Sequence, residues 1–219
     1  MIEARGSRAG LVRAYDFYSR LYGQTAARLE RAAVTRGLAR AQVQPEERVL
    51  EVAVGAAAAF ERLARRVGPR GLLAGVDLSM GMLTATRRKV PGARLARADA
   101  RALPFADDSF DLVWASYLFD LIPTAEMTPV LEEFRRVLRP AAAGRPGGRL
   151  LLVNFSKTGE RLTWWERLYE LTPAWLVPWA WAGCRPVEVE EFVRAAGFVA
   201  VTREFVREGF PSEIITAKK

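Results

Sequence analysis

The stretch Val49-Leu50-Glu51-Val52-Ala53-Val54-Gly55, preceded by Arg48, decides the fold of this chain. It is a short apolar run rich in β-branched residues that ends at a glycine, which is typical of a buried strand. Residues 56–67 continue at helical spacing and stop before Gly68 and Pro69, so a helix is predicted there. A buried strand followed directly by a helix indicates the first half of a βαβ unit.

The same alternation of strand and helix continues along the chain. Further strands are predicted over 72–76, 94–98, 110–115 and 149–155, and helices over 80–89, with Ser79 as N-cap, and over 125–138. A helix over 187–196 precedes strands over 198–206 and 213–217, which the turn Glu208-Gly209-Phe210-Pro211 joins as an antiparallel hairpin. The predicted fold class is α/β: a doubly wound, mostly parallel sheet of seven strands with helices on both faces.

Two segments lie outside this alternation within a single predicted domain, residues 1–219. Residues 1–44 are interpreted as a helical cap, with apolar and aromatic residues at helical spacing at Tyr15, Tyr18, Leu21, Tyr22, Ala26 and Leu29. Residues 156–186 are interpreted as a tryptophan-rich lid insertion, with Trp164, Trp165, Leu168, Tyr169, Leu171, Trp175, Leu176, Trp179 and Trp181 between prolines. The alternatives are a core-facing stripe for the first segment and a buried helical cap for the second.

Composition excludes several kinds of site. The chain has 219 residues, no histidine and one cysteine, Cys184. An internal disulfide, a multi-cysteine metal cluster and catalysis by Ser-His or Cys-His pairs are therefore ruled out. No metal site is predicted, because histidine, the commonest ligand of zinc and iron, is absent, and the sequence contains no carboxylate cluster typical of a magnesium site.

The chain is basic, with 33 Lys and Arg against 25 Asp and Glu and a formal charge of +8. Such a surface favours anionic partners: nucleic acid, acidic lipid or a phosphorylated small molecule. The alternative is an arginine-rich but merely solvated surface. No stretch approaches ~20 consecutive apolar residues, and arginines interrupt the N-terminal segment. We therefore expect a cytoplasmic protein, with peripheral membrane contact left open.

Acidic residues stand where three of the strands end. Glu51 belongs to the first strand, Asp77 ends the second and Asp99 ends the third. In an open parallel sheet, ligands bind outside the carboxyl ends of the strands, and an acid about 20 residues beyond the first turn can accept hydrogen bonds from ribose hydroxyls. A nicotinamide cofactor would need glycines at the positions of Ala53 and Ala58. Three acids around one cleft suit a positively charged cofactor better than a diphosphate.

An ordered set of motifs then resembles a known family. The set comprises the stretch 49–55, Gly75-Val76-Asp77-Leu78-Ser79 with Met82-Leu83, Asp99-Ala100, Leu103-Pro104-Phe105, Asp108-Ser109-Phe110-Asp111, Arg136-Val137-Leu138-Arg139-Pro140 and Pro146-Gly147-Gly148-Arg149-Leu150. Together, over roughly 45–155 with a weaker echo at 186–206, these resemble the class I methyltransferases, which have a Rossmann-like fold. The branch is that of the quinone-biosynthesis C-methyltransferases and phospholipid N-methyltransferases, which use S-adenosyl-L-methionine (SAM) and release S-adenosyl-L-homocysteine.

The resemblance implies a role for each matching position. Glu51 and Gly55 line the methionine end of SAM, Asp77 and Leu78 hold the ribose, and Asp99 and Ala100 flank adenine. Ala53 and Met82 belong to the same cofactor-binding set. Ser116 and Tyr117 face the transferring methyl group, and Tyr15 belongs to an N-terminal helix that closes over the cofactor in relatives. The structural alternative is an ordinary acid or hydroxyl at a strand end.

The chain also departs from the family pattern. The family's glycine loop has glycines where Ala53 and Ala57 stand, so an added methyl could crowd the methionine or disfavour a positive φ angle. The extra Ala141-Ala142-Ala143-Gly144-Arg145 is expected to lengthen a loop away from the cofactor.

The expected activity is methyl transfer to a small hydrophobic or amphipathic acceptor, such as a quinol or a lipid headgroup. Tyr117 and Asp120 are the candidate proton acceptors, with ordinary packing and helix capping as the alternative. Tryptophans near Arg161, Arg167 and Arg185 favour contact with an anionic membrane surface. No specific nucleic acid is predicted, and the oligomeric state is open. The rival hypotheses are an RNA or protein methyltransferase and a catalytically silent SAM-binding scaffold.

Overall fold

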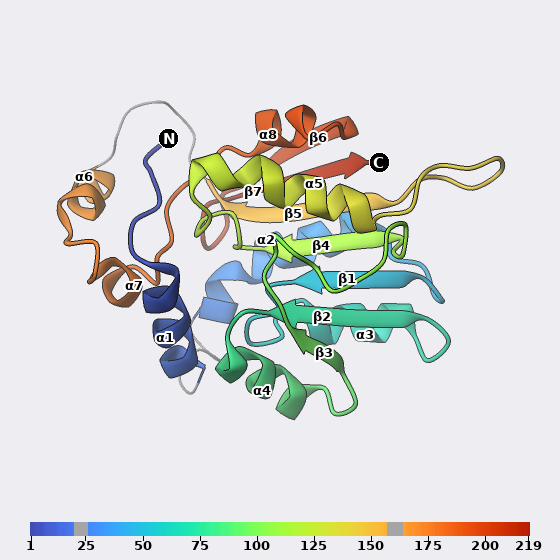
Figure 1. Cartoon of the computed structure of the whole chain (residues 1–219), viewed down its shortest axis with the longest axis horizontal. Coiled ribbons are helices and arrows are strands. Elements are labelled where there is room, and N and C mark those ends of the chain that lie inside the picture. Colours follow the sequence, from blue (N-terminus) through green and yellow to red (C-terminus); the bar gives the residue numbers. More distant parts are fainter. Residues whose placement is uncertain (20–25, 157–163) are drawn as a thin grey trace.

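A seven-stranded sheet forms the centre of the protein, seen in a computed structural model that describes residues 1–19, 26–156 and 164–219 (Figure 1). The strands are β1 (Arg48–Val52), β2 (Leu72–Asp77), β3 (Arg94–Arg97), β4 (Leu112–Ser116), β5 (Arg149–Phe155), β6 (Val199–Val206) and β7 (Ser212–Lys218). Their order is β3-β2-β1-β4-β5-β7-β6. The first five strands run parallel, and β7 pairs antiparallel with both β5 and β6. The predicted fold class is confirmed, including the terminal hairpin.

Helices cover both faces of this sheet. They are α1 (Arg8–Tyr18), α2 (Ala26–Ala41), α3 (Phe60–Val67), α4 (Met80–Lys89), the 3-10 turn η1 (Thr124–Glu126), α5 (Met127–Val137), α6 (Trp164–Leu171), α7 (Val177–Ala180) and α8 (Glu190–Ala195). Alternate residues of each strand face opposite sides: Leu50 packs with α5 and α8, whereas Val49 packs with α2 and α3. Burial on both faces explains the nearly continuous apolar runs of these strands.

Some element boundaries differ from the sequence-based expectations. The helix predicted over 56–67 begins only at Phe60, because Gly55 and Ala57 take φ angles of 50° and 67°, which no helix accommodates. The helix predicted over 125–138 is divided into η1 and α5, and the one over 187–196 shortens to α8. The capping role of Ser79 is confirmed: its hydroxyl accepts a hydrogen bond from the Met82 N–H at 3.1 Å.

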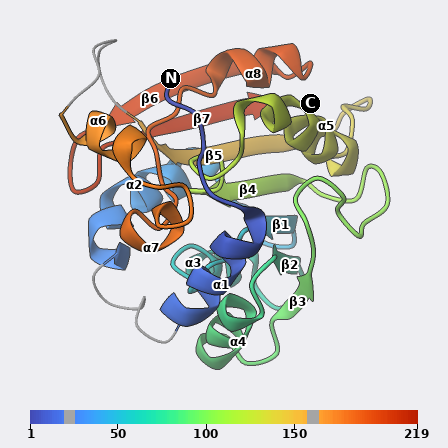
Figure 2. The same ribbon diagram turned by 60° about the vertical axis from the view of Figure 1, so that its left-hand side comes forward.

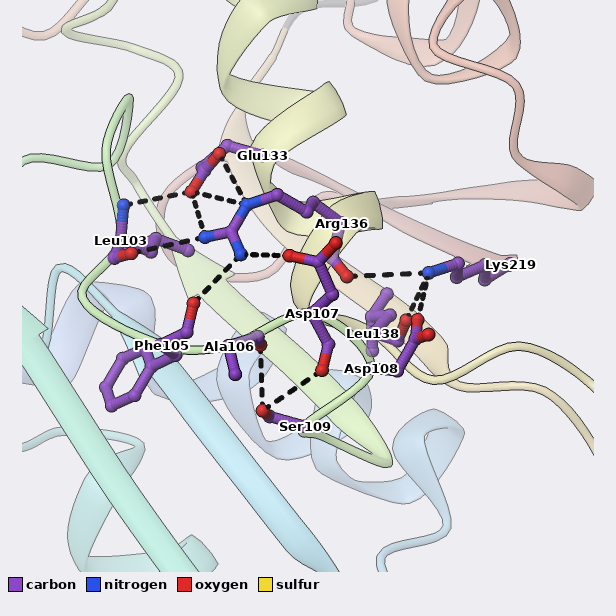
Figure 3. Close-up of polar contacts among 10 residues, drawn as sticks. All are labelled: Leu103, Phe105, Ala106, Asp107, Asp108, Ser109, Glu133, Arg136, Leu138 and Lys219. Carbon is purple, nitrogen blue, oxygen red and sulfur yellow. Dashed lines mark hydrogen bonds and ion pairs between the residues drawn. The ribbon is translucent and has the colours of Figure 1, made fainter.

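An ionic network holds the loop before β4 against α5 (Figure 3). The Arg136 guanidinium pairs with Glu133, ion-pairs with Asp107 at 2.6 Å and donates to the Phe105 carbonyl at 2.9 Å. The Lys219 ammonium closes the same network by donating to Asp108 at 2.6 Å. These contacts fix the loop after β3 from the side of the sheet that α5 covers.

The two ends of the sheet differ in what covers them. Helices α1, α6 and α7 lie beyond the carboxyl ends of β1, β2 and β4, and Figure 2 shows α1 between α7 and α4. The extra loop 141–145 precedes β5 and therefore lies at the opposite end, closed by hydrogen bonds between Ala142 and Arg145. Among the helices that the structure describes, none is both long and apolar enough to cross a membrane.

Candidate active site

A cavity of about 320 Å³ lies at the carboxyl ends of the parallel strands, next to the switch point between β1 and β4. It brings together eleven of the twelve residues that the sequence singled out. These are Tyr15, Glu51, Ala53, Gly55, Asp77, Leu78, Met82, Asp99, Ala100, Ser116 and Tyr117. Asp120 is the twelfth, and it is not among the lining residues.

Glu51 is the most unusual group in this cavity. Its side chain is 1% exposed, and its Oε2 atom has no hydrogen-bond partner among the residues that the structure describes. Burial raises the pKa of the Glu51 carboxyl well above its ordinary value, and the nearby Asp77 raises that pKa further. A buried carboxylate without a partner is costly, so a cationic ligand beside Glu51 would offset that cost.

Asp77 shapes the loop that follows β1. One carboxylate oxygen accepts from the Gly55 N–H at 3.0 Å and the other from the Ser79 N–H at 2.9 Å. Burial raises the Asp77 pKa, although these backbone hydrogen bonds act in the opposite direction. Each oxygen keeps a second lone pair, so Asp77 can still accept hydrogen bonds from the two hydroxyls of a ribose.

Asp99 differs from Glu51 and Asp77 in that it is paired with cationic side chains. Asp99 forms ion pairs with Arg8 at 2.8 Å and with Arg101 at 2.7 Å, and Arg101 also reaches Glu126 at 2.6 Å. The sequence gives no sign of Arg8, because 91 residues separate it from Asp99. Asp99 is therefore neutralised by its neighbours, and the unpaired negative charge of the cavity lies on the β1 and β2 side.

The loop after β1 contains backbone strain where the family has glycines. Ala53 and Ala57 have φ angles of 60° and 67°, in the left-handed region. This conformation costs a residue with a Cβ roughly 1–2 kcal/mol. Both alanines therefore have the positive φ angle that a Cβ atom disfavours, and the chain adopts this loop despite the cost.

The far wall of the cavity begins at the end of β4. Tyr117 lines the cavity with a φ of 54°, and its hydroxyl lies 2.9 Å from the Ser212 Oγ. Burial raises the Tyr117 pKa, which makes its phenol a poor base near neutrality. Asp120 is fully buried and accepts from the Phe155 N–H at 3.0 Å. Asp120 therefore holds the backbone at the end of β5.

Glu30 on α2 is a lining residue that the sequence reasoning missed. Its carboxyl group makes no hydrogen bond or ion pair with any part of the chain that the structure describes, and burial raises its pKa to about 7. A signal was present: Glu30 stands four and eight residues before Val34 and Leu38, on the face of α2 that packs against the sheet. An acid on an otherwise apolar face indicates a buried role.

The α1 helix and the α7 segment are joined over the cavity. The Tyr15 hydroxyl donates to the Ala182 carbonyl at 3.0 Å, and the Tyr18 hydroxyl donates to the Trp179 carbonyl. Leu21, Tyr22 and Arg161 lie outside the described residues. Arg185 was expected near a membrane surface, but it is fully buried and donates to the Ile122 carbonyl at 2.7 Å, so that expectation was wrong.

The comparisons with known proteins agree with this geometry. Residues 49–141 match a methyltransferase domain family. The chain is 30% identical over 146 residues to the ubiquinone/menaquinone biosynthesis C-methyltransferase UbiE of Cupriavidus metallidurans, with 65% of this chain and 56% of that protein covered. Over this region the chain is similar to methyltransferases. The chain spans little more than half the length of that curated relative.

Solved structures share the methyltransferase fold. The protein in complex with the Haloferax volcanii Trm112 methyltransferase activator superposes with a TM-score of 0.70 at 18% identity, covering 95% of this chain and 96% of that one. Haemonchus contortus phosphoethanolamine N-methyltransferase 2, in complex with SAM, gives a TM-score of 0.67 at 17% identity, covering 86% of this chain and 52% of that one. At these identities the likeness concerns the fold alone.

The residues of the cavity fit SAM. The unpartnered Glu51 oxygen matches an ammonium group, and Asp77 has lone pairs free for ribose hydroxyls. The buried side chain of Met82 and the half-buried Leu78 offer apolar surface for a purine.

Proposed function

We propose that this chain binds SAM in the cavity and transfers its methyl group to a small hydrophobic acceptor. The observation that carries the proposal is the buried, unpartnered Glu51 oxygen beside Asp77. Two such acids in one cavity favour a cationic ligand over an anionic one. The proposed SAM-binding set is Tyr15, Glu51, Ala53, Gly55, Asp77, Leu78, Met82, Asp99, Ala100 and Ser116, with Tyr117 at the acceptor end.

The rate of methyl transfer depends mainly on the alignment of the acceptor with the methyl group. When bound, SAM supplies a methyl group on a sulfonium, which is already a good leaving group. The protein must place the acceptor in line with it and keep water out. The cavity lining also includes the apolar side chains of Leu11, Val12, Leu118 and Leu121. These side chains suit a flat hydrophobic ring, and we propose a quinol like those that the name of the Cupriavidus relative indicates.

Calorimetry and a labelled-methyl assay test this function. Calorimetric titration should show that SAM binds the wild-type chain and that Glu51→Gln binds it several-fold more weakly. Purified protein with methyl-labelled SAM and a cell extract should then place label in the small-molecule or lipid fraction. Label in RNA or protein would favour the macromolecular alternatives. SAM binding without any labelled product would favour the silent scaffold, and an absence of SAM binding would refute the proposal.

We further propose that the protein touches an anionic membrane surface through α6 and α7. Three large apolar side chains of this region are strongly exposed: Trp164 at 77% and Leu171 at 79% on α6, and Trp175 at 73% just before α7. Tryptophan prefers the interface between water and lipid, and the exposed Arg167 would add attraction to acidic headgroups. Co-sedimentation with vesicles containing phosphatidylglycerol is expected and should weaken at high salt. A protein that stays in the supernatant at every lipid concentration would contradict this contact.

A further inference from the structure

Glu30 is a third acid of the cavity whose pKa burial raises, after Glu51 and Asp77, and the binding of SAM does not account for it. Building on the proposed methyl transfer, we propose that the Glu30 carboxylate is the general base of the reaction, and that the acceptor is a neutral phenol or enol whose proton Glu30 takes. Glu30 lies outside the family motifs, which begin at residue 49.

The position of Glu30 is firmly held. Its helix lies so close to the sheet that a Cβ atom at Gly37 would come within 2.9 Å of the Trp114 ring. At the start of the helix, the Leu29 carbonyl accepts a hydrogen bond from the Phe210 N–H at 2.9 Å. Glu30 thus enters the cavity from a helix that is anchored both on β4 and on the turn between β6 and β7. A base on a fixed element can be aligned with a substrate.

Among the ionisable groups that surround it, Glu30 is the one whose pKa lies near neutrality. Burial raises its pKa to about 7. The ionisable groups that sense its charge are Tyr117 and Asp120 after β4 and Cys184 after α7, and Tyr15 of α1 contacts that thiol. Burial raises the pKa of both the Tyr117 phenol and the Cys184 thiol, so both stay neutral at pH 7. The Asp120 pKa is also raised by burial, but its carboxyl is engaged with the Phe155 backbone outside the cavity lining.

In the proposed step the acceptor gains one methyl group and loses one proton. The acceptor atom forms a bond to the methyl carbon, while the carbon–sulfur bond breaks and its electron pair stays on sulfur. The acceptor loses one proton from its hydroxyl or from the methylated ring carbon, and the Glu30 carboxylate takes that proton. A base with a pKa near the working pH suits this task, since it is largely ionised before the reaction and still basic enough to accept.

The charges around the cavity narrow the class of acceptor. The lining cations Arg8 and Arg101 are paired with Asp99 and Glu126, whereas Glu30 has no paired cation. The described lining therefore offers no unpaired cation to a phosphorylated acceptor, and a neutral hydroxyl would meet a hydrogen-bond acceptor at Glu30. A quinol satisfies both conditions, because its ring is apolar and its hydroxyl is neutral below pH 9 or so, given a phenol pKa of about 10.

The kinetic test compares wild type with Glu30→Gln and with Glu61→Gln, an exposed helical carboxylate as the matched control. The probe is a short-chain prenyl 1,4-naphthoquinol kept reduced under anaerobic conditions. For wild type and Glu61→Gln, kcat should rise about tenfold per pH unit below pH 7 and then level off. Glu30→Gln should lose this inflection and fall roughly 100-fold or more in kcat. Its Kd for SAM should stay within about twofold, which separates Glu30 from the SAM site.

A second measurement does not depend on turnover. Carboxyl carbon-13 resonances of the complex with S-adenosyl-L-homocysteine are followed from pH 5 to 9, with Glu30→Gln identifying the Glu30 signal. That signal should titrate near pH 7 and should shift when 1-naphthol is added. An active Glu30→Gln enzyme with an unchanged inflection would overturn the proposal, as would a Glu30 signal that titrates below pH 5 and ignores naphthol. A wild-type protein that binds SAM yet methylates no quinol would count against the proposed function, and the resonance experiment would still decide the role of Glu30.

Discussion

Replacing Glu30 by glutamine should stabilise the protein at high pH, although it is expected to slow the reaction. The pKa of Glu30 is about 7 in the folded chain, against an ordinary value of 4.5. Between these two values the folded chain holds a proton that the unfolded chain has lost. The free energy of unfolding therefore falls as the pH rises from about 4.5 to 7 and stays level above that range.

The size of this effect follows from the two pKa values. At ~1.36 kcal/mol for each pH unit, the interval from 4.5 to about 7 corresponds to at most ~3 kcal/mol. Glu30 is not fully buried, so a gain of about 1–3 kcal/mol for Glu30→Gln at pH 8 is expected after allowing for solvent screening. For a chain of this length, that gain raises the melting temperature by roughly 2–12 °C.

Chemical and thermal unfolding at pH 5 and pH 8 measure this difference. Wild type and Glu61→Gln should both lose stability between the two pH values, because Glu51 and Asp77 also have raised pKa values. Glu30→Gln should lose less, and the comparison between variants isolates the Glu30 contribution. Identical pH dependence for Glu30→Gln and wild type would show that Glu30 is ionised at no cost, and the reasoning from its burial would fail.

Three other predictions follow from the cavity and its rim. Asp77→Ala should weaken SAM binding by about 1–3 kcal/mol, roughly 5- to 150-fold in Kd by calorimetry. Unchanged affinity would show that Asp77 does not bind the ribose. Ala57→Gly should raise stability in urea by ~1 kcal/mol because it relieves a φ of 67°, whereas Ala59→Gly, at a φ of −94°, should lower it by a similar amount; the opposite order would deny the strain. Trp175→Ser should reduce vesicle co-sedimentation and leave the melting temperature within about 1 °C, because the ring is 73% exposed. An unchanged bound fraction would remove Trp175 and the segment just before α7 from the proposed membrane contact.

The sequence was most informative where function depends on strand order. Glu51, Asp77 and Ser116 were predicted to meet because the carboxyl ends of parallel strands share one edge of a sheet, and all three line the cavity. That rule needs only that the strands run parallel, which the alternation of strands and helices along the chain predicts. The boundaries of the helix after β1 were less predictable, because alanines favour a helix locally and the loop geometry overrides them at Ala57.

Long-range partners could not be predicted from local patterns. The pairing of Asp99 with Arg8 depends on where α1 crosses the strand ends, and no spacing in the sequence reports that crossing. The burial of Arg185 is a similar case, since a positive charge between aromatic residues was expected to face solvent or lipid headgroups. The composition shows that the chain is rich in arginine. Only the tertiary fold determines which arginines are ion-paired or buried and which are exposed.

The distribution of charge explains how a basic protein can hold an acidic site. The formal charge of +8 describes the whole chain, whereas the two lining arginines, Arg8 and Arg101, are already paired with Asp99 and Glu126. The unpaired acids lie at two separate places, Glu51 where a permanent cation is proposed to bind and Glu30 where a proton is proposed to arrive. A cation next to Glu51 would hold that acid ionised, while Glu30, with no cation paired to it, keeps a pKa that allows exchange. One buried carboxylate is thereby suited to binding and the other to proton transfer, and the difference between them lies in the neighbours of each acid.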